Sequence, residues 1–139
     1  QIVKVDYPSR QAAKITEAYY KTPSTTDYNG IYKGHYIDFD VKESRNKTSF
    51  PLKNIHDHQY KHLKQVNTHG GIAFILIYVH AKDSYYLLPF KALDYFYKRS
   101  ITGRKSITHE ELVTNSLLIK EGFNPRIDYL SAVDILIKK

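Results

Sequence analysis

Eight consecutive residues, Ile72 to Val79, read I-A-F-I-L-I-Y-V and contain neither a charge nor a turn former. An apolar run of this length without polar alternation is typical of a central strand that is covered on both faces. Because such a strand needs cover on each side, the run predicts helices on both faces of its sheet. The chain is therefore expected to adopt an α/β fold with a mixed sheet flanked by helices.

The remaining pattern supplies the elements around that strand. A helix is expected from Pro51 to about Thr68, ended by Gly70 and Gly71. Two further strands are expected, a short one before Pro8 and one over Tyr85 to Phe90 that is antiparallel to its neighbour. Two further helices are expected over 91–99 and near 109–114, the second capped by Thr108 and Glu111. An amphipathic helix is expected over Tyr129 to Lys138, with its inward side formed by Leu130, Val133, Leu136 and Ile137. No internal repeat or linker interrupts the 139 residues, so a single domain over 1–139 is expected.

A second strand is predicted by strict alternation in I-D-F-D-V-K, from Ile37 to Lys42. A period of two places Asp40 and Lys42 on the same face, roughly 6–7 Å apart along the strand. Asn29-Gly30 and Lys33-Gly34 are turn signals, so Asp27 is expected just ahead of a short reversal into this strand. This arrangement would gather two carboxylates and an ammonium around one point.

Such a group of side chains suits the hydrolysis of a phosphodiester. The reaction needs charge neutralisation at the phosphate and a deprotonated water in line with the leaving oxygen, and Mg²⁺ held by carboxylates supplies both. Asp27 and Asp40 are the candidate anchors, with the backbone carbonyl of Val41 as a further ligand. Lys42 would orient the water or stabilise charge on the phosphoryl group, and Asp38, on the same face, is an alternative or supporting ligand.

The charge balance points to a polyanionic partner. Lys and Arg number 21 against 14 Asp and Glu, and the isoelectric point is about 9.4. Nucleic acid is the usual partner of such a surface, and a membrane surface or a merely basic protein without a partner are the alternatives. Candidate phosphate contacts lie in three polar segments, and each has a solvated surface as its alternative: Arg10 and Lys14 near the start, Arg45 and Lys47 after the strand, and Arg104 and Lys105 in a later loop.

Gln59 is the polar member of an apolar helical row formed by Ile55, Leu63 and Val66. A buried amide needs partners, which a nearby carboxylate cluster or water would supply, or else it is a satisfied core group. His58 and His62 have a spacing that can bind zinc, but solvated or DNA-facing histidines are the favoured interpretation. Tyr28 and Tyr36 are candidates for stacking on unpaired bases, although packing roles are more usual for tyrosine.

The chain contains no cysteine, no apolar segment of about 18 residues and no signal-peptide pattern at its first residues. The absence of cysteine removes disulfides, thiolate nucleophiles and cysteine-based zinc sites. A cytoplasmic protein without a membrane segment is therefore expected.

The segment S-T-T-D-Y-N-G-I-Y-K-G-H-Y-I-D-F-D-V-K-E-S-R-N-K-T-S-F-P-L (24–52) resembles the RecU-type Holliday junction resolvases of the PD-(D/E)XK nuclease superfamily. The resemblance continues through H-D-H-Q (56–59), H-G-G-I (69–72), G-R-K-S-I (103–107) and P-R-I-D-Y (125–129), and thus spans nearly the whole chain. It implies a restriction-endonuclease-like fold, a homodimer, and paired nicking of four-way DNA junctions in recombination and repair, with Mg²⁺ or Mn²⁺ as the metal.

The resemblance also assigns residues. The acid-turn-acid-x-Lys motif of the family corresponds to Asp27, Asp40 and Lys42, where Asp40 is one methylene shorter than the common Glu, and the helix Gln corresponds to Gln59. P-S-R-Q-A-A-K (8–14) matches a projecting stalk, expected over about 8–22, that would bring Arg10 and Lys14 to the junction centre. Recombination and branch-migration proteins are expected partners. Family members generally carry further residues, including a basic tail, ahead of the point where this chain begins.

Two other interpretations remain open at this stage. One is a restriction or repair nuclease of the same superfamily, with the same active site and another DNA specificity. The other is a nucleic-acid-binding module without catalysis. Cleavage of a four-way junction compared with nicked and linear duplexes separates the first from a resolvase, and variants of Asp27 or Lys42 separate the second.

Overall fold

The computed structural model describes residues 2–4, 17–19, 28–119 and 129–138. Its main sheet has five strands in the order β3-β4-β6-β7-β9, with β6 (Ile72–Val79) in the centre. β6 runs parallel to β4 (His35–Ser44) and antiparallel to β7 (Ser84–Pro89). The predicted mixed sheet with a central apolar strand is confirmed, and its architecture is consistent with a restriction-endonuclease-like fold.

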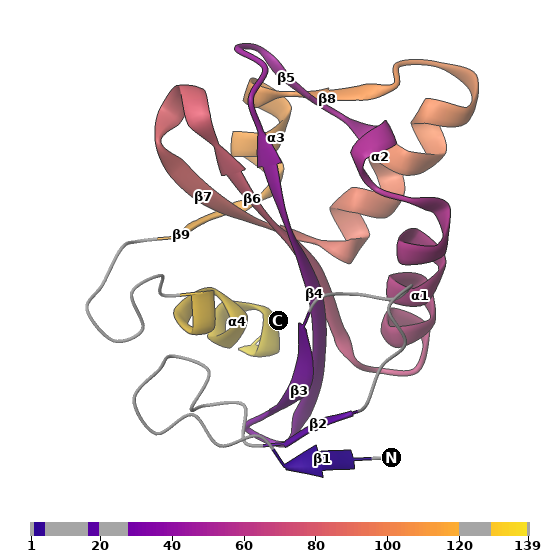
Figure 1. The fold of residues 1–139 in the computed structure, drawn as a ribbon, viewed down its shortest axis with the longest axis vertical. Helices are drawn as coiled ribbons and strands as arrows, with labels where there is room; N and C mark the ends of the chain where they lie inside the picture. Colours follow the sequence, from indigo (N-terminus) through magenta and orange to yellow (C-terminus); the bar gives the residue numbers. More distant parts are fainter. Residues whose placement is uncertain (1, 5–16, 20–27, 120–128, 139) are drawn as a thin grey trace.

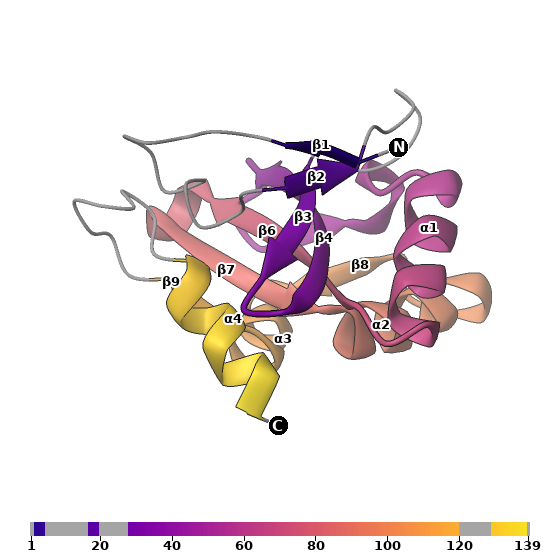
Figure 2. The same cartoon turned by 90° about the horizontal axis from the view of Figure 1, so that it is seen from below.

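Helices cover both faces of this sheet, as Figure 1 and Figure 2 show. On one face, α1 (Asp57–Thr68), α2 (Phe90–Thr102) and α3 (His109–Asn115) enclose a core that contains Leu63, Ile75, Leu93 and Leu112. On the other face, α4 (Tyr129–Lys138) buries Leu130 and Val133 and packs Leu136 and Ile137 against a second core. The inward side of α4 is therefore as predicted.

The hairpin of β3 (Tyr28–Tyr32) and β4 turns at Lys33 and Gly34, where both residues have positive φ. Two residues with positive φ match the right-handed twist of a tight hairpin. The prediction of a further turn at Asn29-Gly30 is wrong, because both residues lie inside β3. Asn29 pairs with Asp38 of β4, and Gly30 pairs with Ile37. The predicted strand at Ile37–Lys42 is present and extends in both directions.

The segment before α1 differs from the prediction. The chain forms β5 (Ser49–Pro51) and a single 3-10 turn, η2 (Leu52–Asn54), and the helix begins only at Asp57. β5 pairs with β8 (Ser106–Thr108), and the Leu52 amide donates to the Lys105 carbonyl at 3.0 Å. This long-range pairing overrides the helix start signal at Pro51. β8 and the edge strand β9 (Leu117–Ile119) were not predicted, because three residues give no readable period.

Near the N-terminus, β1 (Ile2–Lys4) and β2 (Glu17–Tyr19) form a separate antiparallel pair that lies beside β3 (Figure 2). The rest of the stalk expected over 8–22 lies outside the described residues. The stalk therefore stays a prediction.

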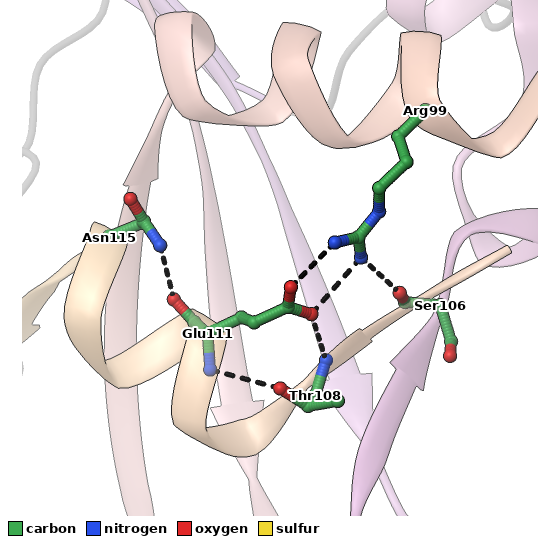
Figure 3. A network of polar contacts seen from close by, with 5 residues as sticks. All are labelled: Arg99, Ser106, Thr108, Glu111 and Asn115. Atoms are coloured by element: carbon green, nitrogen blue, oxygen red, sulfur yellow. Dashed lines mark hydrogen bonds and ion pairs between the residues drawn. The ribbon is translucent and has the colours of Figure 1, made fainter. Parts of the chain in front are cut away.

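A network of polar contacts fixes α3 between α2 and β8 (Figure 3). Thr108 caps α3 by accepting from the Glu111 amide, and the Glu111 carboxylate accepts from the Thr108 amide. The same carboxylate receives both Nη atoms of Arg99, at 2.6 and 3.0 Å, and Arg99 also donates to the Ser106 carbonyl. The capping box predicted from Thr108 and Glu111 is confirmed, and Arg99 lowers the pKa of Glu111 to about 2.

Candidate active site

The strand β4 presents Asp38, Asp40 and Lys42 on the face that carries α1. Their parallel partners on β6 are Ala73, Ile75 and Ile77, which all belong to the core beneath α1 and α2. Both carboxylates are fully buried, whereas Lys42 is half-buried and borders a groove. The alternation of the sequence therefore places Asp40 and Lys42 on the same side of the strand as predicted, together with Asp38.

The other predicted acid, Asp27, lies outside the described residues, as do Arg10 and Lys14. The neighbouring residue Tyr28 is described, and it pairs with Phe39 in the hairpin. Phe39 directly precedes Asp40 in β4. The expectation that Asp27 joins Asp40 around a metal ion therefore stays a prediction.

Gln59 connects α1 to the strand. Its side-chain oxygen Oε1 accepts a hydrogen bond from Lys42 Nζ at 3.1 Å and from the backbone amide of His56 at 3.0 Å. The Gln59 side chain is buried and lies at the third helical position. Its one oxygen therefore both caps α1 and holds the amine of Lys42. A buried amide with partners was expected, but the cation Lys42 takes the place of the expected carboxylates or water.

Asp38 makes a second connection to the same helix. Its Oδ2 lies 2.7 Å from His62 Nε2 and accepts from the Tyr36 hydroxyl at 2.8 Å. A carboxylate oxygen accepts, so the imidazole nitrogen is the donor in this contact. This pair could not be found from the sequence alone, because residues 24 apart come together only when α1 packs on β4.

The histidines form no zinc site in the part of the chain that the structure describes. His62 is engaged with Asp38, and the ring of His58 stacks on that of His56 with centroids 5.6 Å apart. Within the described ranges, no three His, Asp or Glu side chains gather as metal ligands. Tyr36 bonds to Asp38, and the exposed Tyr28 stacks on Phe39 at 5.1 Å, so both have packing partners in the fold.

A groove of about 670 Å³ opens beside Lys42. Its lining is rich in cationic and amide side chains: Val41, Lys42, Glu43, Arg45, Asn46, Pro51, Lys53, Asn54 and His56. A second hollow of about 420 Å³ shares Pro51 and Lys53 with the first and includes Lys105. Lys53 therefore lies where the two hollows meet, a position that no local sequence pattern indicated.

The predicted phosphate contacts of the described chain differ in how they lie relative to this groove. Arg45 is exposed and lies 3.4 Å from Glu43, whose pKa is lowered by the hydrogen bond from His80 and by the charge of Arg45. Lys47 lines a different hollow, of about 540 Å³, with Lys82 and His109. Arg104 is exposed in the loop after α2, and Lys105 Nζ donates to the Ser100 carbonyl at 2.8 Å. Arg45 and Lys105 thus border the groove system that contains Lys42, and Lys47 does not.

The described helices include none with the length and apolar character required to cross a membrane. The five-stranded mixed sheet with helices on both faces defines the chain as an α/β protein whose architecture is consistent with a restriction-endonuclease-like fold. The family model of Recombination protein U (RecU) matches residues 1–135.

Curated relatives agree with this family. The chain is 58% identical over 135 residues to the "Holliday junction resolvase RecU" of Bacillus thuringiensis (strain Al Hakam), covering 96% of this chain and 68% of that protein. It is 56% identical over 137 residues to the protein of the same name from Bacillus cereus (strain B4264), covering 98% of this chain and 68% of that protein. The chain belongs to the RecU family.

Proposed function

We propose that this protein is an endodeoxyribonuclease that resolves four-way DNA junctions by paired nicks during recombination and repair. The name of its relatives supports the substrate, since both are called Holliday junction resolvases. The structural observation that carries the chemistry is the position of Lys42. It shares a strand face with the buried Asp40, its amine is held by Gln59, and it borders a basic groove.

The donor set suits a hard divalent cation. Carboxylate and backbone carbonyl oxygens are the ligands that Mg²⁺ and Mn²⁺ accept in proteins. We assign Asp27, Asp40 and the carbonyl of Val41 to the metal. When bound, the metal would neutralise phosphate charge and lower the pKa of a water.

Lys42 would act on the reacting groups directly. With its amine held by Gln59 Oε1, the ammonium keeps further N–H donors for a phosphoryl oxygen or the attacking water. In the hydrolysis, the attacking water gives up a proton as its oxygen forms a bond to phosphorus, the bond to the leaving oxygen breaks, and the leaving oxygen takes up a proton from solvent. A fixed cation stabilises the charge that develops at phosphorus, because it does not have to reorient during the step.

Gln59 is the second member of this pair. Its oxygen is held from the other side by the His56 amide, so the acceptor cannot rotate away without uncapping α1. The neutral amide orients Lys42 and leaves its charge intact, whereas a carboxylate at this position would neutralise it.

The groove system provides a path for a DNA strand beside Lys42. Phosphates would meet Arg45 and Lys53 in the first hollow and Lys105 in the second. Lys47 and Arg104, with Arg10 and Lys14 on the proposed stalk over 8–22, would contact the arms of the junction. A homodimer would bring two such sites to one junction, and recombination and branch-migration proteins are the expected partners in a cytoplasmic setting.

The decisive experiment is cleavage of a four-way junction labelled at each 5′ end, with and without Mg²⁺ or Mn²⁺. Wild type, Asp27→Asn, Asp40→Asn and Lys42→Ala are compared on the junction, a nicked duplex and a linear duplex. Metal-dependent symmetric nicks by wild type alone, with binding retained in the variants, support the proposal. Equal cutting of linear duplex would instead indicate another nuclease of the superfamily, and binding without any cleavage would indicate a non-catalytic module.

A further inference from the structure

Two polar contacts connect α1 to β4, and they lie on either side of Asp40. Lys42 bonds to Gln59, and Asp38 bonds to His62. We propose that Asp38 and His62 are positioning residues: their contact sets where α1 lies along β4 and so holds Gln59 against Lys42. This inference rests on the proposed function, because it assigns the pair a role in nicking.

The order of the contacts follows from the topology. β4 and β6 are parallel, so the connecting helix α1 runs back antiparallel to both. The earlier residue of α1, Gln59, therefore meets the later residue of β4, Lys42, and His62 meets Asp38. A single contact would leave the helix able to slide or roll on the sheet. The two contacts start from β4 residues about 13 Å apart and from α1 residues about one turn apart, so together they oppose both motions.

The Asp38 contact is built for this task. Its carboxylate is fully buried, and one oxygen receives both the Tyr36 hydroxyl and His62 Nε2. Tyr36 belongs to β4 itself and so adds no connection to the helix. His62 is on α1 and is the member that joins the two elements.

Close packing at the end of α1 also restricts its movement. A Cβ placed on Gly71 would lie 2.7 Å from Val66 Cγ1 and 3.2 Å from Tyr36 Cδ2. Val66 is on α1 and Tyr36 is the hydroxyl donor to Asp38. Gly71 therefore lies close both to α1 and to Tyr36, so the end of the helix packs beside the residue that donates to Asp38. His62 and Gln59 are three residues apart, about one helical turn, so a shift of His62 moves Gln59 as well.

The test replaces His62 with Ala, which removes the contact, and with Gln, whose amide can donate to Asp38 again. Three quantities are measured: the single-turnover nicking rate, the junction Kd without divalent metal, and the side-chain amide signals of Gln59 in the NMR spectrum of the DNA-free protein. For His62→Ala we expect nicking about 10–100-fold slower, a Kd within about twofold of wild type, and shifted Gln59 signals. His62→Gln should recover most of the rate and the wild-type signals.

Tyr32→Phe is the matched control. The Tyr32 hydroxyl donates to Asp134 Oδ1 at 3.1 Å and connects β3 to α4 on the face of the sheet away from α1. It should lower Tm but leave the nicking rate and the Gln59 signals unchanged, with every assay run well below the lowest Tm.

Two results would overturn the inference. Either His62→Ala lowers Tm while nicking at the wild-type rate with unmoved Gln59 signals, or His62→Gln is no better than Ala. If wild type itself nicks no junction, the proposed function fails, and the Gln59 signals still decide whether His62 positions the helix.

Discussion

Two helices of this protein begin with the same local device but use it differently. In α1 the third residue, Gln59, accepts from the backbone amide of His56, and in α3 the third residue, Glu111, accepts from that of Thr108, each at 3.0 Å. Each side chain also receives a cation from another element, Lys42 in the first case and Arg99 in the second. The two sites differ in the chemical nature of the acceptor and of the cation.

That difference decides what each site can do. At α3, a carboxylate and a guanidinium form two parallel hydrogen bonds, so each charge is neutralised by its partner (Figure 3). At α1, a neutral amide makes one bond to an ammonium, and the positive charge of Lys42 is kept beside a groove. We call the network at α3 closed, because its two charges neutralise each other, and such a network stabilises the fold. We call the network at α1 open, because the charge of Lys42 is not neutralised and can bind an anion.

The comparison is tested most strongly by Lys42→Ala. This change should slow junction nicking by about 10²–10³-fold, because one fixed donor to the developing charge is lost. Junction binding should change by no more than a few-fold, since the other groove cations remain. Single-turnover cleavage and fluorescence anisotropy measure the two quantities separately.

The matched change in the closed network is Arg99→Ala, which removes a cation of similar burial. It should lower the free energy of unfolding and leave the nicking rate of the folded protein unchanged. If Lys42→Ala nicks at the wild-type rate, or if Arg99→Ala slows nicking as much, the distinction between the two sites is wrong.

The next largest effect is expected from Gln59→Ala. The variant loses both the cap and the acceptor that fixes Lys42, so we expect about tenfold slower nicking and about 1 kcal/mol lower stability. Thr108→Ala removes a capping side chain of α3, the acceptor of the Glu111 amide, and should cost similar stability without slowing nicking. Urea unfolding measures the stability of both variants, and single-turnover cleavage measures their nicking rates. Equal nicking by the two variants would mean that Gln59 serves only as a cap.

The two devices were not equally visible in the sequence. Thr108 and Glu111 form the common T-x-x-E pattern, so α3 and its cap could be predicted from local residues alone. His56 is an unusual cap residue, and the start of α1 was placed too early, at Pro51. The partner of Gln59 is 17 residues away and could be identified only after α1 had packed on β4.

The same reason explains the rest of the fold and site. β6 was predicted within its bounds because eight apolar residues form an unmistakable pattern, and the alternation around Asp40 placed it with Lys42 on one face. The three-residue strands β5, β8 and β9 depend on pairing with distant segments. Asp38–His62 and Lys53 likewise gain their roles from neighbours that are remote in sequence.

A smaller effect is expected where the groove cations are exposed and act additively. Lys53→Ala should weaken junction binding a few-fold and reduce the slope of log Kd against log salt by about 1, because one phosphate contact is lost. Lys138→Ala is the control, since it removes an exposed lysine from α4 on the other face of the sheet. Anisotropy titrations between about 50 and 200 mM salt measure both slopes. Identical slopes for the two variants would exclude Lys53 from the DNA path.

Glu111→Gln ends the series, because we expect it to leave the nicking rate unchanged. It should instead change how the free energy of unfolding depends on pH. Arg99 lowers the pKa of Glu111 from an ordinary 4.5 to about 2. The ionised Glu111 therefore stabilises the folded state at pH values above the pKa that this side chain has in the unfolded chain. The stabilisation is lost as the pH falls through the lower pKa of Glu111 in the folded protein. We expect wild type to exceed Glu111→Gln by about 1–2 kcal/mol at pH 7, because both side chains are partly solvated. The difference should shrink between pH 4.5 and about 2.

Glu110→Gln provides the control for this last prediction, since it removes the same charge from the exposed neighbouring residue. Urea unfolding at several pH values should give it nearly the wild-type stability throughout. If Glu111→Gln and Glu110→Gln are equally stable at pH 7, the Arg99 network does not stabilise the fold. If Glu111→Gln also slows nicking at neutral pH, the network is coupled to the active site, and the two capping devices are not as independent as their geometry indicates.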